Sequence, residues 1–401
     1  MNHLLLDIAE ARQSLLPLTY TRPIAAMRVG IDTIAEKWQR RIPTSWSYGT
    51  VAYLQARYAP TFGEDNLLIH GGLCPTDALL SALDALERGQ SLVQEGKVLA
   101  ARTGEAEARA AVDSLALPEQ SSIPFNAPVT VIENVWEIFQ KNGEQIREDF
   151  AVITAGRHSA GLDCPHTVLY GKENIFAEEG VTVMASVINA QNGPVYLGKN
   201  STLEEGVLVR GPLALGEGAT VNMGAKLRGD NTIGPWCKVG GEVSNSVLFA
   251  YSNKGHDGFI GNTVIGEWCN LGADTNTSNL KNNYASVKVW NYKRGGFVDT
   301  GQQFCGLIMG DHSKTGINTM LNTGTVVGVS ANIFGPGFPR NFVPSYAWGG
   351  SQGFSTFQLR KAYEVAGKVM PRRHRELDDV EKGILEAVFE ASAEYRVWEK
   401  Q

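Results

Sequence analysis

A histidine between glycines is the residue whose surroundings best suit catalysis. His256 lies in the segment Lys254-Gly-His-Asp-Gly258, and the flanking glycines allow the chain to approach a ligand closely. A neutral imidazole accepts a proton near neutral pH, so His256 is a candidate general base. The alternative is a surface histidine without a catalytic role. Asp257 is not assigned as its partner, because the side chains of adjacent residues usually diverge.

Two arginines and a second histidine are further candidates. Arg210 and Arg228 are eighteen residues apart, and in the repeat described next this spacing stacks them on one face. Such a pair could clamp a phosphate group, and a solvated face explains it equally well. His312, in Gly310-Asp-His-Ser-Lys314, is a second candidate base, although a polar corner of the repeat is the preferred interpretation.

A six-residue repeat must position these side chains. Three short strands per coil, each with one apolar side chain facing inward, form a hexapeptide parallel β-helix with left-handed crossovers. We expect this fold over residues 166–340. The repeating positions, apolar except for one threonine, are Ile175, Val181, Val187, Leu197, Leu203, Val209, Leu215, Val221, Leu227, Ile233, Val239, Ile265, Leu271, Met309, Thr315, Leu321, Val327 and Ile333.

Two stretches break the repeat, at about residues 245–259 and 276–306. We expect both to be insertions, because functional sites are often built on irregular segments of a rigid repeat. The first contains His256, and the second contains the basic residues Lys281 and Lys288.

The flanking regions have different patterns. Residues 1–165 alternate short apolar runs with helical patterns, which predicts an α/β domain. Its predicted elements are a strand at Leu4–Asp7, a helix at Asp77–Glu87 capped by Thr76, a helix at 134–146 broken near Gly143, and a strand at Ala151–Thr154. Residues 341–401 contain two predicted helices, 356–370 and 376–398, separated by Pro371. We expect these helices to cap the end of the β-helix.

The composition disfavours several classes of protein. The 401 residues carry a net charge of −6 without a basic stripe, so nucleic acid is not an expected partner. Five scattered cysteines contain no CxxC pair, which favours reduced thiols in a cytoplasmic protein over a disulfide framework or a metal site. No apolar run is long enough for a signal peptide or a membrane span, so no membrane association is expected.

The stretch from His256 to Asn279, HDGFIGNTVIGEWCNLGADTNTSN, resembles the acetyltransferase half of a known family. The family is the bifunctional N-acetylglucosamine-1-phosphate uridyltransferase/glucosamine-1-phosphate N-acetyltransferases, in which a histidine precedes an aromatic residue and the repeat. The whole chain resembles the variant branch found in Bacteroidetes-type bacteria, with segments such as GEVSNS and GLIMGDHSK. The resemblance implies a nucleotidyltransferase-like domain, a left-handed β-helix and a homotrimer.

The resemblance also implies roles for individual residues. His256 matches the general base, and Ala273 matches a backbone contact with acetyl-CoA. The family's downstream lysine falls where this chain departs from the pattern. For Asn270 the alternative is a corner residue chosen for positive φ. The positions that match contacts with substrate are Phe259, Asn270, Asn279 and, in place of the lysine, Lys281 or Lys288.

The N-terminal domain departs further from the family. There, a glycine-rich loop holds the nucleoside triphosphate. Here both glycines are missing, Ile24 replaces the expected lysine, and Gly72 replaces the expected metal-binding aspartate. Two interpretations remain open: a degenerate sugar-nucleotide-binding domain, or an active nucleotidyltransferase that uses UTP and Mg²⁺. The candidate nucleotide contacts are Arg12, Arg22 and Arg28.

Together these implications predict an acetyl-CoA-dependent N-acetyltransferase that acts on an amino sugar-1-phosphate of the glucosamine-1-phosphate type. The nucleotidyltransferase-like domain would convert the product into a nucleotide sugar of the UDP-N-acetylglucosamine type for the cell envelope. The alternative is a sugar-nucleotide-binding or scaffold trimer with an inactive N-terminal domain. Zinc chemistry on the same fold is disfavoured, because the sequence lacks three suitably spaced histidines.

Overall fold

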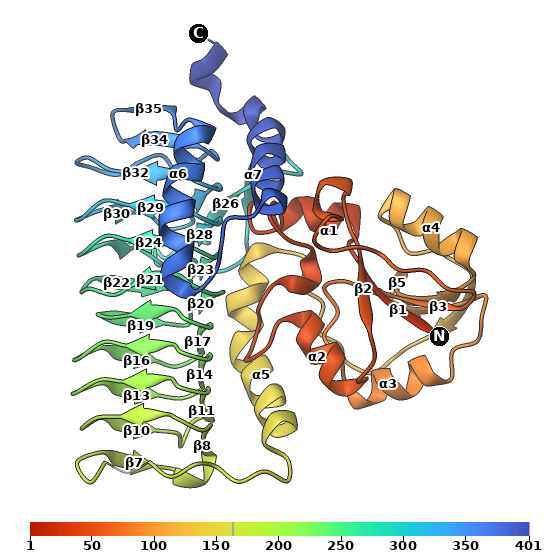
Figure 1. The fold of residues 1–401 in the computed structure, drawn as a ribbon, viewed down its shortest axis with the longest axis horizontal. Helices are drawn as coiled ribbons and strands as arrows, with labels where there is room; N and C mark the ends of the chain where they lie inside the picture. Colours follow the sequence, from red (N-terminus) through yellow and green to blue (C-terminus); the bar gives the residue numbers. More distant parts are fainter. Residues whose placement is uncertain (163, 401) are drawn as a thin grey trace. The chain divides into compact units, whose positions relative to one another are not determined.

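Two compact units make up the chain in the computed structural model, which describes residues 1–162 and 164–400 (Figure 1). The first unit comprises Met1–Met27 and Asp32–Asn134. The second begins with Arg28–Ile31 and continues from Val135. The predicted boundary at 165/166 therefore lies within the second unit, because the helix that begins at Val135 packs against the β-helix.

The first unit is an α/β domain, as predicted. Its six-stranded sheet has the order β2-β1-β3-β5-β4-β6, in which β5 runs antiparallel to both of its neighbours. The Thr76 hydroxyl accepts a hydrogen bond from the Leu79 N–H and caps α3, as expected. The strands are β1 (Asn2–Leu6), β2 (Trp46–Gly49), β3 (Asn66–His70), β4 (Gln90–Gln94), β5 (Lys97–Thr103) and β6 (Ser121–Pro124). The α-helices are α1 (Ala9–Ser14), α2 (Ile34–Arg41), α3 (Asp77–Asp84) and α4 (Glu105–Ser114).

The predicted break near Gly143 and the predicted strand at Ala151–Thr154 are both wrong. A single helix, α5 (Val135–Thr154), runs through both positions. Gly143 allows α5 to pack closely against the β-helix, because a Cβ at this position would lie 2.0 Å from Oδ1 of Asp230. The short apolar run that suggested a strand is part of the buried face of this helix, which includes Ile153.

Parallel strands in three sheets form the left-handed β-helix that the repeat predicts (Figure 1). The first sheet contains β7 (Val168–Tyr170), β10 (Val187–Asn189), β13 (Leu208–Arg210), β16 (Lys226–Arg228), β19 (Glu242–Ser244) and β22 (Phe259–Gly261). The second contains β8 (Ile175–Ala177), β11 (Val195–Leu197), β14 (Leu213–Leu215), β17 (Asn231–Ile233), β20 (Val247–Leu248), β23 (Val264–Ile265), β28 (Ile308–Met309), β31 (Val326–Val327) and β33 (Phe342–Val343). The third contains β9 (Thr182–Val183), β12 (Thr202–Leu203), β15 (Thr220–Val221), β18 (Lys238–Val239), β21 (Asn253–Lys254), β24 (Asn270–Leu271), β29 (Lys314–Thr315), β32 (Asn332–Ile333) and β34 (Ala347–Gly350). A final strand, β35 (Gly353–Thr356), joins this sheet antiparallel to β34.

The inward residues of successive coils stack into one continuous apolar core, which includes every predicted position from Leu197 to Val239. The earliest predicted positions need correction, because Val181 and Val187 are only partly buried. Val183 and Ile188 face inward instead, in register with the inward residues of the next coil. Corners of unequal length at the start of the β-helix shift the phase of the repeat.

The predicted first insertion, residues 245–259, is instead a coil of the β-helix. It contributes β20, β21 and the start of β22 to the three sheets. Lys254 pairs with Val239, only fifteen residues earlier, whereas a full coil of three six-residue strands has eighteen. Short corners therefore hide the repeat at this point without interrupting the strands.

The second predicted insertion is present. After β25 (Asn276–Thr277), which pairs with β30 (Met320–Leu321), the chain leaves the coil. It forms an antiparallel hairpin of β26 (Lys288–Asn291) and β27 (Gly296–Asp299), and the β-helix resumes at β28.

The C-terminal helices lie along the side of the β-helix. The helices α6 (Leu359–Val369) and α7 (Asp379–Ala391) flank a 3₁₀ helix at Met370–Arg373 that contains Pro371. Ala366 packs against Trp268 of the β-helix, and α6 runs beside the strands in Figure 1. Trp398 of the last described turn packs against the interior core, whereas α6 contacts the β-helix through Trp268. None of the described helices combines the length and apolar character that crossing a membrane requires.

Candidate functional site

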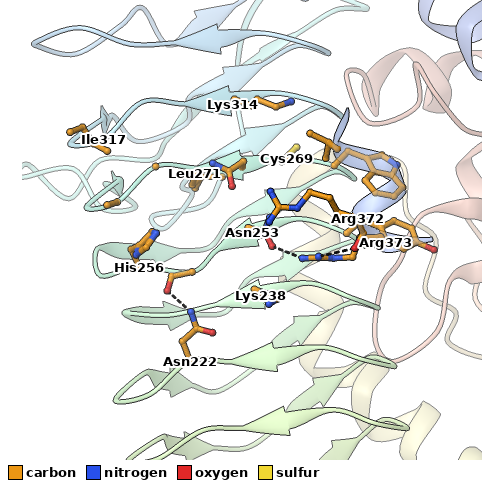
Figure 2. Close-up of a pocket in the computed structure, with 17 residues that line it drawn as sticks. Asn222, Lys238, Asn253, His256, Cys269, Leu271, Lys314, Ile317, Arg372 and Arg373 are labelled. Atoms are coloured by element: carbon orange, nitrogen blue, oxygen red, sulfur yellow. Dashed lines mark hydrogen bonds between the residues drawn. The ribbon is translucent and has the colours of Figure 1, made fainter. Parts of the chain in front are cut away.

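A cavity of about 620 Å³ lies on the outer face of the third sheet (Figure 2). One wall carries outward side chains from the neighbouring strands β18, β21, β24 and β29. Backbone pairing places Lys238, Asn253, Asn270 and Lys314 side by side in a single column. The 3₁₀ helix after α6 contributes further residues to the lining. The β-helix and its C-terminal extension therefore build this cavity together.

Three residues predicted from the sequence line the cavity: His256, Asn270 and Ala273. His256 and Ala273 occupy corners of successive coils, which are joined by a hydrogen bond from the Asp274 N–H to the Asp257 carbonyl (3.1 Å). The Ala273 N–H donates no hydrogen bond to any other residue of the described chain. The arrangement thus offers a proton acceptor, a side-chain amide and an uncommitted backbone donor around one space.

The corner that carries His256 is held from inside the β-helix. Lys254 is fully buried, and its Nζ donates to the carbonyl oxygens of His256 (2.5 Å) and Asp257 (2.8 Å). Burial lowers the pKa of Lys254 to about 8. The Asn222 side chain donates to the Gly255 carbonyl at 2.7 Å (Figure 2). The backbone on both sides of His256 is therefore fixed, while its imidazole is exposed to solvent.

Four cationic side chains surround the same cavity. Lys238 and Lys314 stand at the two ends of the strand column, and burial lowers the pKa of Lys314. Arg373 donates to the Trp236 carbonyl and to Oδ1 of Asn253, both at 3.3 Å. Arg372 forms no ion pair with any residue that the structure describes. Such a charge distribution suits phosphate-bearing ligands.

Sequence reasoning missed these four cations. The short coil at 239–254 hides the register, so the column of outward residues cannot be recognised from the repeat. The available signal was the basic segment Met370-Pro-Arg-Arg-His-Arg375 directly after a predicted helix.

Phe259 and Asn279 lie on the adjacent face, beyond the corner that carries His256. Phe259 begins β22 in the first sheet, and its N–H donates to Oδ1 of Asn276. The Asn279 side chain donates to Oδ1 of Asn262 at 2.8 Å. A Cβ on Gly261 would contact both the Phe259 ring and the Asn279 amide, so these two side chains are neighbours. Neither lines the cavity described above.

The predicted arginine pair and lysines lie elsewhere on the second unit. Arg210 and Arg228 are adjacent on β13 and β16, as their spacing predicts, and both are exposed. Arg228 is paired with Glu242 at 2.8 Å. Lys288 lies on the hairpin, and Lys281 donates to the Ser286 carbonyl at 2.7 Å, so neither joins His256.

His312 is a buried corner residue, in line with the preferred interpretation. It is only 5% exposed, has a φ of +60°, and lies 3.7 Å from Glu381 of α7. Its ring stacks near Trp268, with 6.3 Å between the centroids. This placement makes His312 a packing residue between the β-helix and α7.

The three predicted nucleotide contacts are buried. Within the first unit, Arg12 donates to Asp7 (2.8 Å), the Arg22 carbonyl and the Tyr53 hydroxyl. Asp7 also accepts from the Ile24 N–H and the Thr50 hydroxyl. Arg22 is 3% exposed, and Arg28, which belongs to the second unit, donates to the Phe249 carbonyl. A phosphate could reach Arg12 only if this buried network opened.

The backbone around Gly72, where the resemblance predicts a metal-binding aspartate, is also closely packed. A Cβ on Gly72 would lie 2.3 Å from the Ile132 carbonyl oxygen, so the backbone leaves no room for an aspartate. Nearby, the His70 side chain and Lys97 lower the pKa of Glu133 to about 2. Within residues 1–162 and 164–400, no three side chains of the metal-binding types are grouped to hold an ion.

Comparisons with known proteins bear on the N-terminal region. Residues 4–158 match the family model described as sugar nucleotidyl transferase. No curated protein matches the chain. Among solved structures, the UDP-N-acetylglucosamine acyltransferase of Arabidopsis is similar over 53% of this chain and 80% of its own, with 14% identity and a TM-score of 0.27. At this TM-score the similarity supports no inference about function.

Proposed function

We propose that the second unit is an acetyl-CoA-dependent N-acetyltransferase that acts on an amino sugar-1-phosphate, with His256 as the general base. The observation that carries this proposal is the placement of His256. It lies on a cavity whose lining combines three asparagines, the Ala273 corner and four cationic side chains. Both substrates carry phosphate groups, so a base beside a cationic cavity suits this pair of substrates.

The reaction needs few protein groups. The amine nitrogen attacks the thioester carbonyl carbon, a C–N bond forms and the C–S bond breaks. His256 accepts the proton that leaves the nitrogen, and the proton is then passed to the departing thiolate sulfur. The Ala273 N–H is available to stabilise the oxyanion that develops on the carbonyl oxygen. Asn270, which projects from the strand column, is in position to hold a sugar hydroxyl.

For the first unit we propose binding of a sugar nucleotide or its precursors, UTP and a sugar-1-phosphate. The family match over residues 4–158 supports this assignment. The buried Arg12 network and the crowded backbone at Gly72 favour the hypothesis that the domain binds these ligands without turnover. The other hypothesis is nucleotidyl transfer with Mg²⁺, and a pyrophosphate-release assay distinguishes the two hypotheses. A homotrimer in the cytoplasm remains part of the proposal.

Thiol release from acetyl-CoA with glucosamine-1-phosphate as the acceptor tests the acetyltransferase. We expect turnover by the wild type and a decrease in kcat of about 10²–10⁴-fold in His256→Ala. His166→Ala is the matched control, because His166 is an exposed histidine on the same unit outside the cavity. A wild type that is folded and trimeric but releases no thiol would favour the scaffold alternative. An unaffected His256→Ala variant would remove His256 from the mechanism.

A further inference from the structure

A second cavity lies near the end of the β-helix and shares no lining residue with the His256 cavity. Its volume is about 900 Å³. The hairpin β26–β27, the turn between β34 and β35, and residues 394–398 near the C-terminus all contribute to its lining. This volume is within the range of sites for small organic ligands.

Aromatic side chains from separate segments form much of the lining. Trp290 of the hairpin stacks on Phe342 of β33, with 4.2 Å between the centroids and 11° between the planes. Tyr395 packs edge-on against Phe342 at 5.8 Å. On the other part of the lining, Phe354 packs against Trp398 at 5.8 Å. Rings held by one another in this way provide fixed flat surfaces for a planar ligand group.

One residue that lines the cavity carries a hydrogen-bond donor without a partner in the described part of the chain. Nε1 of Trp290 is buried and has no partner within the described residues. A buried indole N–H normally has a hydrogen-bond partner.

Cationic groups complete the lining. Lys281, Lys288 and Arg340 line the cavity, together with the carboxylate of Glu394. Arg340 and Lys288 are exposed, and no ion pair of Arg340 is found in the part of the chain that the structure describes. The excess of positive charge beside aromatic surfaces suits an anion attached to an aromatic group, rather than an apolar ligand.

We propose that this cavity binds a nucleoside diphosphate. The base lies among the aromatic rings, and the phosphates contact Arg340 and Lys288. Gln352, in the glycine-containing turn Gly350–Gly353, is available for the ribose hydroxyls. All its lining residues belong to the second unit and none of them lines the His256 cavity, so the site does not depend on the proposed reaction.

Hydrogen–deuterium exchange of the full chain locates binding, with UDP and ADP as probes. We expect protection of residues 286–300 and 340–356 with at least one of the two nucleotides. Protection confined to other segments with both probes would overturn the proposal. Inorganic pyrophosphate tests the role of the base, because equal protection at equal concentration would mean a simple anion site and would also overturn it.

Calorimetric titration of variants tests the individual contacts. Trp290→Ala removes one ring of the aromatic lining, and we expect its affinity at this site to fall about tenfold or more. We expect Arg340→Ala to weaken binding similarly, with a smaller effect at high salt. Arg294→Ala, on the turn of the same hairpin but outside the lining, is the control and should bind like the wild type. Unchanged affinity in both Trp290→Ala and Arg340→Ala would reject the site.

Discussion

The Nζ of Lys254 lies 2.5 Å from the carbonyl oxygen of His256, the residue two positions after Lys254 in the chain. Lys254 occupies an inward position of the β-helix, in register with Val239. An ammonium group therefore replaces an apolar side chain in the core at the coil that carries the candidate base. Its two hydrogen bonds fix the corner from within, so we regard Lys254 as a positioning residue for His256.

Lys254→Met should leave the core filled but release the corner. We expect kcat for acetyl transfer to fall about tenfold to a hundredfold with little change in KM for acetyl-CoA, because misplacing a base mainly affects the chemical step. Steady-state kinetics of thiol release measures this. Lys199→Met, at an exposed lysine, is the control. Loss of acetyl-CoA binding with kcat unchanged would contradict a positioning role.

The pKa of Lys254 also predicts a pH dependence of stability. Its pKa is about 8 in the folded protein, against an ordinary value of 10.5. Between these values the unfolded chain binds more protons at this site, so the free energy of unfolding should rise with pH from about 8 toward 10.5. Denaturant unfolding at pH 7.5, 8.5 and 9.5 should show a steeper rise in the wild type than in Lys254→Met. Parallel curves for the two proteins would refute the assignment.

Gly143 and Gly367 are both helix-interior glycines with opposite surroundings. A Cβ at Gly143 would collide with Asp230, whereas Gly367 in α6 faces open space. We expect Gly143→Ala to destabilise the protein by about 1–3 kcal/mol through overpacking. We expect Gly367→Ala to stabilise it by about 0.5–1 kcal/mol. Thermal or denaturant unfolding measures both.

A second substitution checks the cause at Gly143. Asp230 has a φ of +50°, which glycine adopts without strain. Adding Asp230→Gly should therefore recover most of the stability lost in Gly143→Ala. A double variant as unstable as the single one would show that the collision with Asp230 is not the cause.

The buried pair of Asp7 and Arg12 should be structural. The two side chains are 1% and 7% exposed. We expect Arg12→Met to destabilise the first unit by about 3–5 kcal/mol, because it leaves the Asp7 carboxylate buried without its partner. Arg109→Met, which removes an exposed pair with Glu105, should cost less than about 1 kcal/mol. A fully stable Arg12→Met variant with impaired UTP binding would restore the nucleotide-binding role predicted from the sequence.

Arg372 should contribute to binding and not to chemistry. We expect Arg372→Ala to raise KM for acetyl-CoA about tenfold, with kcat nearly unchanged and with a smaller effect at high salt. Arg360→Ala is the matched control, because Arg360 lies on α6 outside the cavity and is 3.8 Å from Glu364. Equal KM values for Arg372→Ala and the control would place the phosphates elsewhere.

The β-helix could be predicted from the sequence because every coil imposes the same physical requirement on its residues. One inward apolar residue per six is needed in every coil, so the pattern from Leu197 to Val239 predicts its own packing. The coil at 245–259 escaped recognition because its corners are short, although its strands pair like the others. Short corners shift the six-residue period of the apolar residues, so the period is lost here although the strands are present.

The candidate site could be predicted only in part. His256, Asn270 and Ala273 lie within one local stretch, and the structure places them around one cavity. Arg372 and Lys238 come from segments more than a hundred residues apart, and only the docking of α6 on the β-helix brings them together. The same limit applies to Arg12, whose buried carboxylate partner decides its role.

The last strand of the β-helix has a consequence for self-association. β35 runs antiparallel to β34 and ends its sheet, and the Trp398 indole donates to the Thr356 hydroxyl on this strand at 2.9 Å. A parallel solenoid that simply stopped would offer its final coil as a template for the first coil of another molecule. Reversing the chain there breaks the repeat of parallel strands. This removes the parallel template from the third sheet, which disfavours stacking end to end into a fibre.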